Sequence, residues 1–122
     1  MNIGPVTPIL RSFDEALARD FYVRYLGFEV LFEHRFEPGL PLYLGLRRGA
    51  CELHLSEHHG DASPGASVRI AVDDVDALQA ELAARGHPNL RPAVHAMPWG
   101  TRDLAVTDPF GNRLTFTSAI SL

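Results

Sequence analysis

Hydrophobic positions in the first half of the chain change from a short apolar run to helical spacing and then to alternation. Leu17, Phe21 and Leu26 follow roughly helical spacing, and Ser12 or Asp14 is a candidate helix N-cap ahead of them. Gly27 is placed to end this helix. The pattern predicts strands over residues 3–10, 28–36, 40–46 and 50–56, with the helix between the first two.

The same order of elements returns after a loop at residues 57–65 that is rich in His, Gly, Ser and Pro. Asp73 or Asp74 is expected to cap a second helix, and Gly86 to end it. Strands are predicted over residues 67–72, 91–97, 102–107 and 113–118, with a hairpin turn at 108–112. The chain therefore reads β-α-β-β-β twice, which predicts an α+β fold in one domain, 1–122, with modules at about 1–58 and 66–122.

Alternation along the predicted strands assigns side chains to two faces. In the strand at 50–56, Cys51, Leu53 and Leu55 share a core-facing side, which makes Cys51 an inert, buried thiol. Polar residues occupy the other side of the strands at 50–56, 67–72 and 113–118: Glu52, His54, Ser56, Ser67, Arg69, Arg113, Thr115 and Thr117. Such a face is either solvated or lines a concave site, and spacing alone leaves both open.

Composition narrows the class of protein. The 122 residues are 46% hydrophobic with a formal net charge of −4, so there is no electrostatic reason to expect nucleic acid or an anionic membrane as a partner. Cys51 is the single cysteine, which rules out an intrachain disulfide. No signal peptide or membrane-spanning run is recognised, and we expect a cytoplasmic protein.

Three ordered motifs resemble the glyoxalase/bleomycin-resistance/extradiol-dioxygenase superfamily, also called vicinal oxygen chelates. They are Phe21-Tyr22 with Tyr25-Leu26-Gly27-Phe28, Val72-Asp73-Asp74-Val75, and Asp108-Pro109-Phe110-Gly111-Asn112. The resemblance covers nearly the whole chain and is strongest to bleomycin-resistance proteins. It implies two βαβββ modules forming a curved, cup-like mixed sheet with helices on the outer face. For a short member it also implies a homodimer with sites built between subunits.

The resemblance also locates the positions at which catalytic members hold a divalent metal. They correspond here to Thr7, His54, Ser67 and Thr115, of which only His54 is a strong ligand type. We therefore expect no metal, no other cofactor and no catalytic residue. Two alternatives are a metal held by His34 and His54 with Glu52, and metal binding by His58-His59 in the central loop.

Aromatic residues indicate what the concave face holds. Trp99, in the segment Pro98-Trp99-Gly100, and Phe32 and Phe36 match groove aromatics of bleomycin-resistance proteins by position. Such rings stack on planar, cationic or heteroaromatic ligands. They can instead pack in a dimer interface without a ligand. The predicted ligand-binding residues are Phe32, His34, Phe36, His54, Trp99, Gly100, Arg102 and Thr115.

The leading hypothesis is a non-enzymatic homodimer that sequesters a small molecule, such as a cationic glycopeptide antibiotic of the bleomycin type, and so confers antibiotic resistance. One alternative is an enzyme: a metal-dependent lyase or dioxygenase using His54, or a thiol transferase acting on an antibiotic. Another is a dimeric interaction module whose cup is filled by its own side chains.

Overall fold

The first half of the protein forms a four-stranded mixed sheet covered by one helical segment. The computed structural model describes residues 1–120. The elements are β1 (Ile9–Arg11), α1 (Glu15–Arg19), a π-helix η1 (Asp20–Tyr25), β2 (Glu29–His34), β3 (Tyr43–Arg48) and β4 (Cys51–Ser56). The strand order is β1-β4-β3-β2, with β1 parallel to β4 and the other pairs antiparallel.

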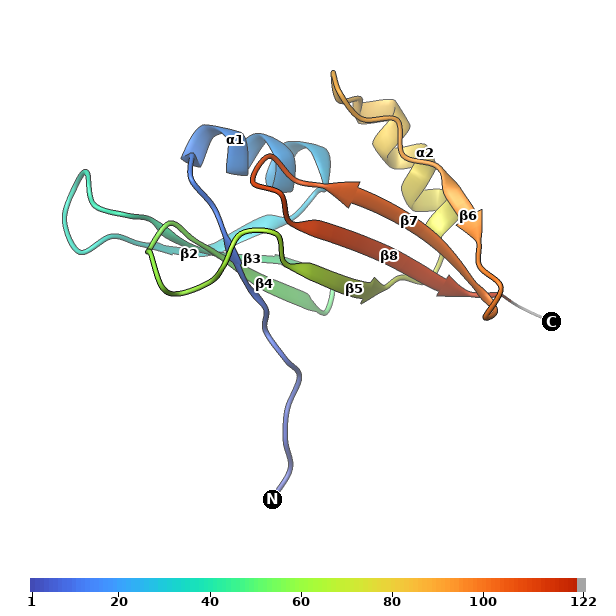
Figure 1. The fold of residues 1–122 in the computed structure, drawn as a ribbon, viewed down its shortest axis with the longest axis horizontal. Coiled ribbons are helices and arrows are strands. Elements are labelled where there is room, and N and C mark those ends of the chain that lie inside the picture. The colour runs from blue at the N-terminus through green and yellow to red at the C-terminus, as the bar shows by residue number, and fades with distance from the viewer. Residues whose placement is uncertain (121–122) are drawn as a thin grey trace.

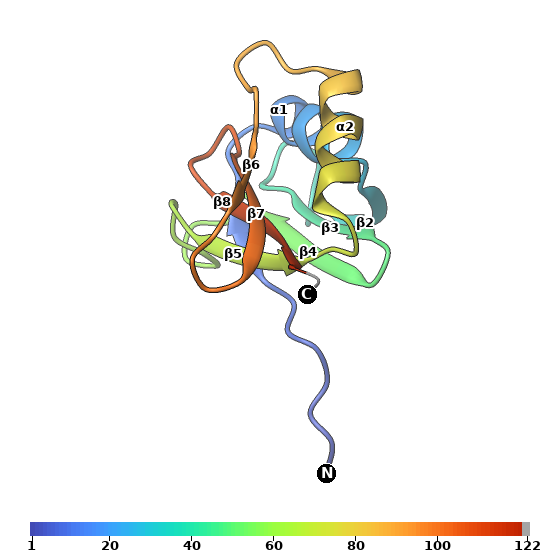
Figure 2. The same cartoon turned by 90° about the vertical axis from the view of Figure 1, so that its right-hand side faces the viewer.

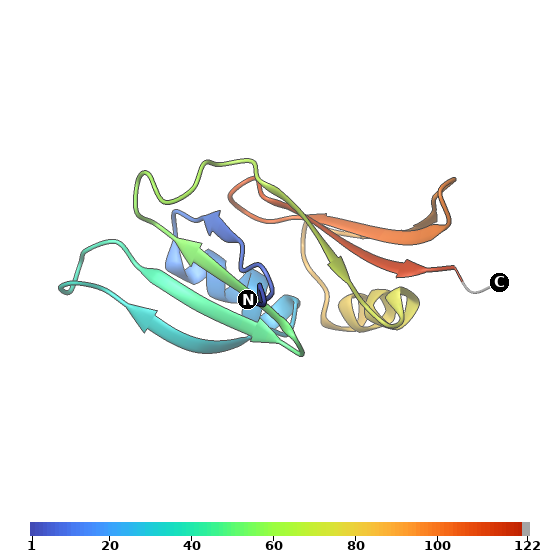
Figure 3. The ribbon, with the colours of Figure 1, turned by 90° about the horizontal axis from the view of Figure 1, so that it is seen from below.

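The second half repeats this arrangement. Its elements are β5 (Ser67–Ala71), α2 (Val75–Arg85), β6 (Val94–Ala96), β7 (Thr101–Thr107) and β8 (Arg113–Ala119), in the sheet order β5-β8-β7-β6. Here β5 is parallel to β8, as β1 is to β4. Figures 1 and 3 show the two sheets side by side, with α2 packed on one face of its own sheet. The predicted α+β fold with βαβββ modules is confirmed.

Predicted capping residues define both helical segments. The carboxylate of Asp14 accepts from the backbone N–H of Leu17 at 2.9 Å, and that of Asp74 from Ala77 at 3.0 Å. Gly86 follows α2 with φ +74°, a conformation that glycine adopts readily. Within η1 the hydrogen bond from Leu26 N–H to Phe21 C=O spans five residues, as in a π-helix.

The hydrophobic core lies between the helical segments and the two sheets. Its largest fully buried side chains are Tyr22, Tyr25, Phe21, Leu10, Leu26, Leu44, Leu46, Leu53, Leu55, Leu82, Leu104 and Leu114. The helical segments of the two modules lie close together at the top of Figure 2. Arg24 donates to the carbonyl of Gly86 at 3.1 Å and Arg85 to that of Tyr25 at 3.0 Å, so side chains of each module hold the backbone of the other.

Several expectations about element boundaries are wrong. The first strand begins at Ile9, and the chain before it projects from the body as an extended arm (Figures 1 and 2). Pro5 and Pro8 lack the N–H that a strand interior needs, which explains the late start. Leu17 was expected on the apolar helix face but is about half exposed.

The remaining strands keep their predicted order with adjusted ends. The third begins at Tyr43 instead of residue 40, and the sixth contains only Val94–Ala96. Cys51 is half-buried, short of the predicted full burial, and burial raises the pKa of its thiol. No helix among residues 1–120 combines the length and the apolar character needed to cross a membrane.

Candidate functional site

The face of the first sheet that α1 leaves uncovered carries one row of side chains across three strands. In the register, Phe32 on β2 lies opposite Gly45 on β3, and Gly45 lies opposite His54 on β4. The ring of Phe32 lies over Gly45, so closely that a Cβ at this position would be 2.2 Å from the ring. Position 45 must therefore be glycine for the Phe32 ring to keep this place over β3.

Aromatic contacts extend this row into a small cluster. The rings of Phe32 and Tyr43 are nearly parallel, 10° apart, with centroids 6.1 Å from each other. His54 meets Phe32 edge-on at 5.2 Å and Tyr43 at 5.3 Å. The cluster presents aromatic surface and ring nitrogens on the same open face, a combination suited to a flat, partly polar ligand.

His54 is held by hydrogen bonds at both ring nitrogens. The Tyr43 hydroxyl lies 2.7 Å from Nδ1, and a carboxylate oxygen of Glu52 lies 2.7 Å from Nε2. Burial raises the pKa of the Tyr43 phenol, so its hydroxyl keeps its proton. These two side chains fix the orientation of the imidazole.

The end of β2 and the loop after it are strongly exposed. All six residues of β2 are exposed, Phe32 by 42%, and Phe36 beyond the strand is 74% exposed. His34 meets the ring of Phe36 edge-on at 4.8 Å. The predicted ligand residues Phe32, His34 and Phe36 therefore lie on one accessible margin of the first sheet.

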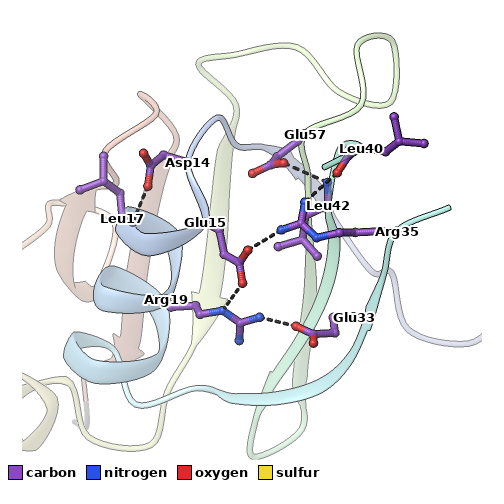
Figure 4. A network of polar contacts seen from close by, with 9 residues as sticks. All are labelled: Asp14, Glu15, Leu17, Arg19, Glu33, Arg35, Leu40, Leu42 and Glu57. Atoms are coloured by element: carbon purple, nitrogen blue, oxygen red, sulfur yellow. Dashed lines mark hydrogen bonds and ion pairs between the residues drawn. The ribbon is translucent and has the colours of Figure 1, made fainter. Parts of the chain in front are cut away.

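An ion-pair network positions this margin relative to α1 (Figure 4). Glu15 pairs with both Arg19 and Arg35, and Arg19 also reaches Glu33. Arg35 donates to the carbonyl of Leu40 at 2.6 Å, which ties the two sides of the loop together. The hydrogen bond from Arg19 holds the pKa of the Glu15 carboxyl below its usual range. Glu33 and Arg35 thus pair with residues of α1, whereas His34 contacts Phe36.

The open face of the second sheet has its own polar cluster around Asp103. This carboxylate accepts from the Thr117 hydroxyl at 2.7 Å, from Thr101 at 2.9 Å and from Arg69 at 3.1 Å. The hydrogen bond from Thr117, with those from Arg69 and Thr101, lowers the pKa of Asp103. Thr115 is 8% exposed and lies opposite Arg69 in the register.

Besides Thr115, three predicted ligand residues lie away from the first sheet. Trp99 and Gly100 form the turn between β6 and β7, at the opposite end of the molecule from β2 (Figures 1 and 3). Trp99 is 63% exposed, and Gly100 has φ +97°. Arg102 pairs with Asp76 of α2 at 2.7 Å, on the helix side of its sheet. One chain therefore brings Phe32, His34, Phe36 and His54 together but keeps Trp99 far from them.

The family's metal positions do not fit a divalent ion in this chain. Thr7 lies in the exposed arm, Ser67 and Thr115 are hydroxyls on the other sheet, and both nitrogens of His54 already have partners. Binding a metal would cost His54 one of these hydrogen bonds. Within residues 1–120, no group of three or more His, Cys, Asp or Glu side chains is arranged to hold a metal ion.

Tyr43, and the pairing of Glu52 with His54, were missed as features of the site by the sequence analysis. The alternation of Leu42, Leu44 and Leu46 places Tyr43 and Gly45 on the open face of the same strand. The alternation that predicts the open face for His54 on β4 therefore predicts it for Tyr43 on β3 as well.

The fold is similar to solved structures that include bleomycin-binding and antibiotic-binding proteins. The chain is similar to a bleomycin-binding protein solved in complex with bleomycin, with 27% identity, TM-score 0.72, and coverage of 95% of this chain and 98% of that one. It is also similar to a bleomycin resistance determinant encoded on transposon Tn5, with 26% identity, TM-score 0.74, and 96% and 98% coverage.

A third similar structure is TnmS3, an antibiotic-binding protein from Streptomyces sp. CB03234, with 28% identity, TM-score 0.70, and coverage of 98% of both chains. Among curated proteins, no sequence matches the chain. The family described as "Glyoxalase superfamily protein" matches residues 2–121. The chain therefore belongs to the glyoxalase superfamily.

Proposed function

We propose that this protein is a non-enzymatic homodimer that binds and sequesters a bleomycin-type antibiotic in the cytoplasm. The observation that carries the proposal is the exposed aromatic margin formed by Phe32 and Phe36 beside the Tyr43–His54 pair. Three similar structures, at 26–28% identity, are described as bleomycin-binding, bleomycin-resistance or antibiotic-binding proteins. Capture of the drug is stoichiometric, with no bond made or broken.

The exposed aromatic surface supports ligand binding over a solvated sheet face. A solvated sheet face is expected to carry polar side chains, because leaving large apolar rings in water is unfavourable. Phe32 and Phe36 are instead 42% and 74% exposed. Stacking of a planar heteroaromatic group on these rings would remove that apolar area from water. A positively charged ligand gains further from the ring faces and from the net charge of −4.

The separation of Trp99 from Phe32 supports a groove shared by two subunits. In one chain, β2 with Phe32 and the β6–β7 turn with Trp99 lie at opposite ends of the fold (Figure 1). In a two-fold dimer, the β6–β7 turn of one subunit can lie against β2 of the other. The two-fold symmetry then generates a second, identical groove.

The N-terminal arm also supports association. Ile3 and Val6 are 92% and 87% exposed, in an extended segment that projects from the body (Figure 2). Apolar side chains this exposed are stabilised by burial against another surface. A second copy of the chain, which is always present with the first, can supply such a surface.

Titration with bleomycin tests this function directly. Trp99 is the single tryptophan, so tryptophan fluorescence reports on the β6–β7 turn alone. We expect a saturable fluorescence change with one bleomycin per subunit, and a dimer mass by light scattering. Calorimetry on Trp99→Ala and Phe36→Ala, with Asp73→Ala as an exposed control, is expected to show weaker binding for the first two only.

Unchanged Trp99 fluorescence and no heat of binding at micromolar bleomycin would contradict the proposal. A monomer that binds the drug would contradict the shared groove and leave the binding function intact.

A further inference from the structure

We propose that Tyr43 is a ligand-contacting residue whose hydroxyl oxygen accepts a hydrogen bond from an N–H donor of the bound molecule, and that Glu52 is the positioning residue that fixes this polarity through His54. The inference rests on the proposed binding function. It names the chemical class that this part of the groove selects: a flat, nitrogen-bearing ring or amide that presents a donor.

The polarity of the chain of hydrogen bonds follows from what each group can donate. A carboxylate such as that of Glu52 only accepts, so the Nε2 atom of His54, 2.7 Å away, must carry a proton. A neutral imidazole has only one ring proton, so Nδ1 is then an acceptor. With the ring in this neutral form, the Tyr43 hydroxyl, 2.7 Å from Nδ1, donates to it.

This arrangement uses the only proton of the Tyr43 hydroxyl and leaves its oxygen as an acceptor. Within residues 1–120, His54 is the single hydrogen-bond partner of this hydroxyl. A ligand group that approaches the oxygen must donate, and a ligand carbonyl in the same place would be repelled. This chain of hydrogen bonds from Tyr43 through His54 to Glu52, here called the relay, thus distinguishes N–H donors from acceptors at one point of the groove.

Neighbouring rings determine where the donor lies. The ring planes of Phe32 and Tyr43 are nearly parallel, with 6.1 Å between ring centroids. The faces of the two rings therefore point in the same direction. A planar ligand that stacks on Phe32 brings the atoms at its edge toward the Tyr43 oxygen. Gly45, which leaves room for the Phe32 ring over β3, is part of the same geometry.

The relay makes a prediction that needs no ligand. Nitrogen NMR of the His54 ring at about pH 8, where an ordinary imidazole is neutral, should show the Nε2–H form in the unliganded protein. Glu52→Gln keeps an acceptor oxygen and should retain this form, whereas Glu52→Ala should give a mixture of both tautomers. A dominant Nδ1–H form or a fully protonated ring in the native protein at this pH overturns the proposal.

Binding of bleomycin measured by calorimetry tests the contact itself. Tyr43→Phe keeps the stacked ring and removes the acceptor, and it should weaken binding roughly threefold to tenfold, the usual effect of one hydrogen bond. Glu52→Ala should weaken binding by a similar factor, and Glu52→Gln should restore it. Asp73→Ala controls for loss of one negative charge, and thermal unfolding confirms that each variant folds.

The outcomes separate the two proposals. If the native protein binds bleomycin and Tyr43→Phe binds equally well, the contact is refuted and the binding function stands. If the native protein does not bind bleomycin, the binding function fails, and with it the assignment of Tyr43 to ligand recognition. The tautomer measurement still decides in that case whether Glu52 fixes the polarity of His54.

Discussion

The hydroxyl of Tyr22 donates a hydrogen bond of 2.6 Å to the carboxylate of Asp108, 86 residues later in the chain. Tyr22 belongs to η1 of the first module, and Asp108 begins the hairpin turn between β7 and β8 of the second. The same carboxylate accepts from the Asn112 side chain, whose amide also donates to the carbonyl of Arg11 at 2.8 Å. The turn motif therefore joins the two modules through a buried polar network.

Removal of the Tyr22 hydroxyl should weaken this connection. Burial and the adjacent Asp108 carboxylate raise the pKa of Tyr22, so the phenol stays protonated and donates throughout the ordinary pH range. We expect Tyr22→Phe to lower the free energy of unfolding by about 1–3 kcal/mol, the cost of leaving a buried charged acceptor with one donor fewer. Urea unfolding measures this change.

Tyr25→Phe provides the control, because the Tyr25 side chain is 1% exposed, compared with 0% for Tyr22, and its hydroxyl makes no hydrogen bond within residues 1–120. Equal losses in the two variants would show that the Tyr22–Asp108 bond adds nothing to stability.

Acid should destabilise the protein partly through Asp103. Its pKa is lowered in the folded state, first by the hydrogen bond from Thr117 and then by those from Arg69 and Thr101. The folded state therefore favours the ionised form, and this contribution is present above the ordinary pKa of an aspartate and is lost as the pH falls through the lowered pKa. Between about pH 6 and about pH 2, Asp103→Asn should lose less thermal stability than the native protein.

The exposed residue Asp73 supplies the comparison for this pH series. Asp73→Asn should follow the native curve, and an Asp103→Asn curve that does the same would refute the assignment.

Gly45 should affect binding through Phe32 alone. A Cβ at position 45 would be 2.2 Å from the Phe32 ring, which must then swing off the sheet. Because Phe32 is exposed, this movement costs little stability, but it removes the stacking surface. We expect Gly45→Ala to weaken bleomycin binding about as much as Phe32→Ala does, with a small change in melting temperature.

A double-mutant cycle checks this dependence. In the Phe32→Ala background, Gly45→Ala should have no further effect on affinity. Additive losses of affinity would show that Gly45 acts independently of Phe32.

The arm should contribute to dimer stability. Burial of side chains such as Ile3 and Val6 stabilises an interface by roughly 1–3 kcal/mol each. The double variant Ile3→Ser and Val6→Ser is therefore expected to raise the dimer dissociation constant by at least about tenfold. Sedimentation at several concentrations measures it, with Asn2→Ser as an exposed control, and an unchanged dissociation constant would exclude the arm from the interface.

Local signals in the sequence were sufficient for most of the fold. Asp14, Asp74 and Gly86 act at the helix ends where they were predicted, since capping depends on a few neighbouring residues. Alternation placed His54 and Glu52 on the same open face for a similar reason. The first strand was predicted too long because its apolar composition was given more weight than its two prolines.

The candidate site was harder to predict because its parts come from distant elements. Periodicity does not show that Phe32 lies over Gly45, since this requires the pairing of β2 with β3 in one register. Nor does it show that Trp99 lies at the other end of the chain's fold from Phe32. That separation comes from the placement of two whole sheets, and it is the reason for proposing a groove shared by two subunits.

Mixing two defective variants tests the shared groove most directly. Phe32→Ala and Trp99→Ala homodimers each lack one aromatic residue in both grooves. After subunit exchange, each heterodimer contains one groove with both aromatic residues, contributed by different chains. We predict that about a quarter of the grooves then bind bleomycin with native affinity in calorimetry, given statistical exchange into dimers. No recovery of native-affinity binding in a mixture shown to contain heterodimers would contradict the shared groove.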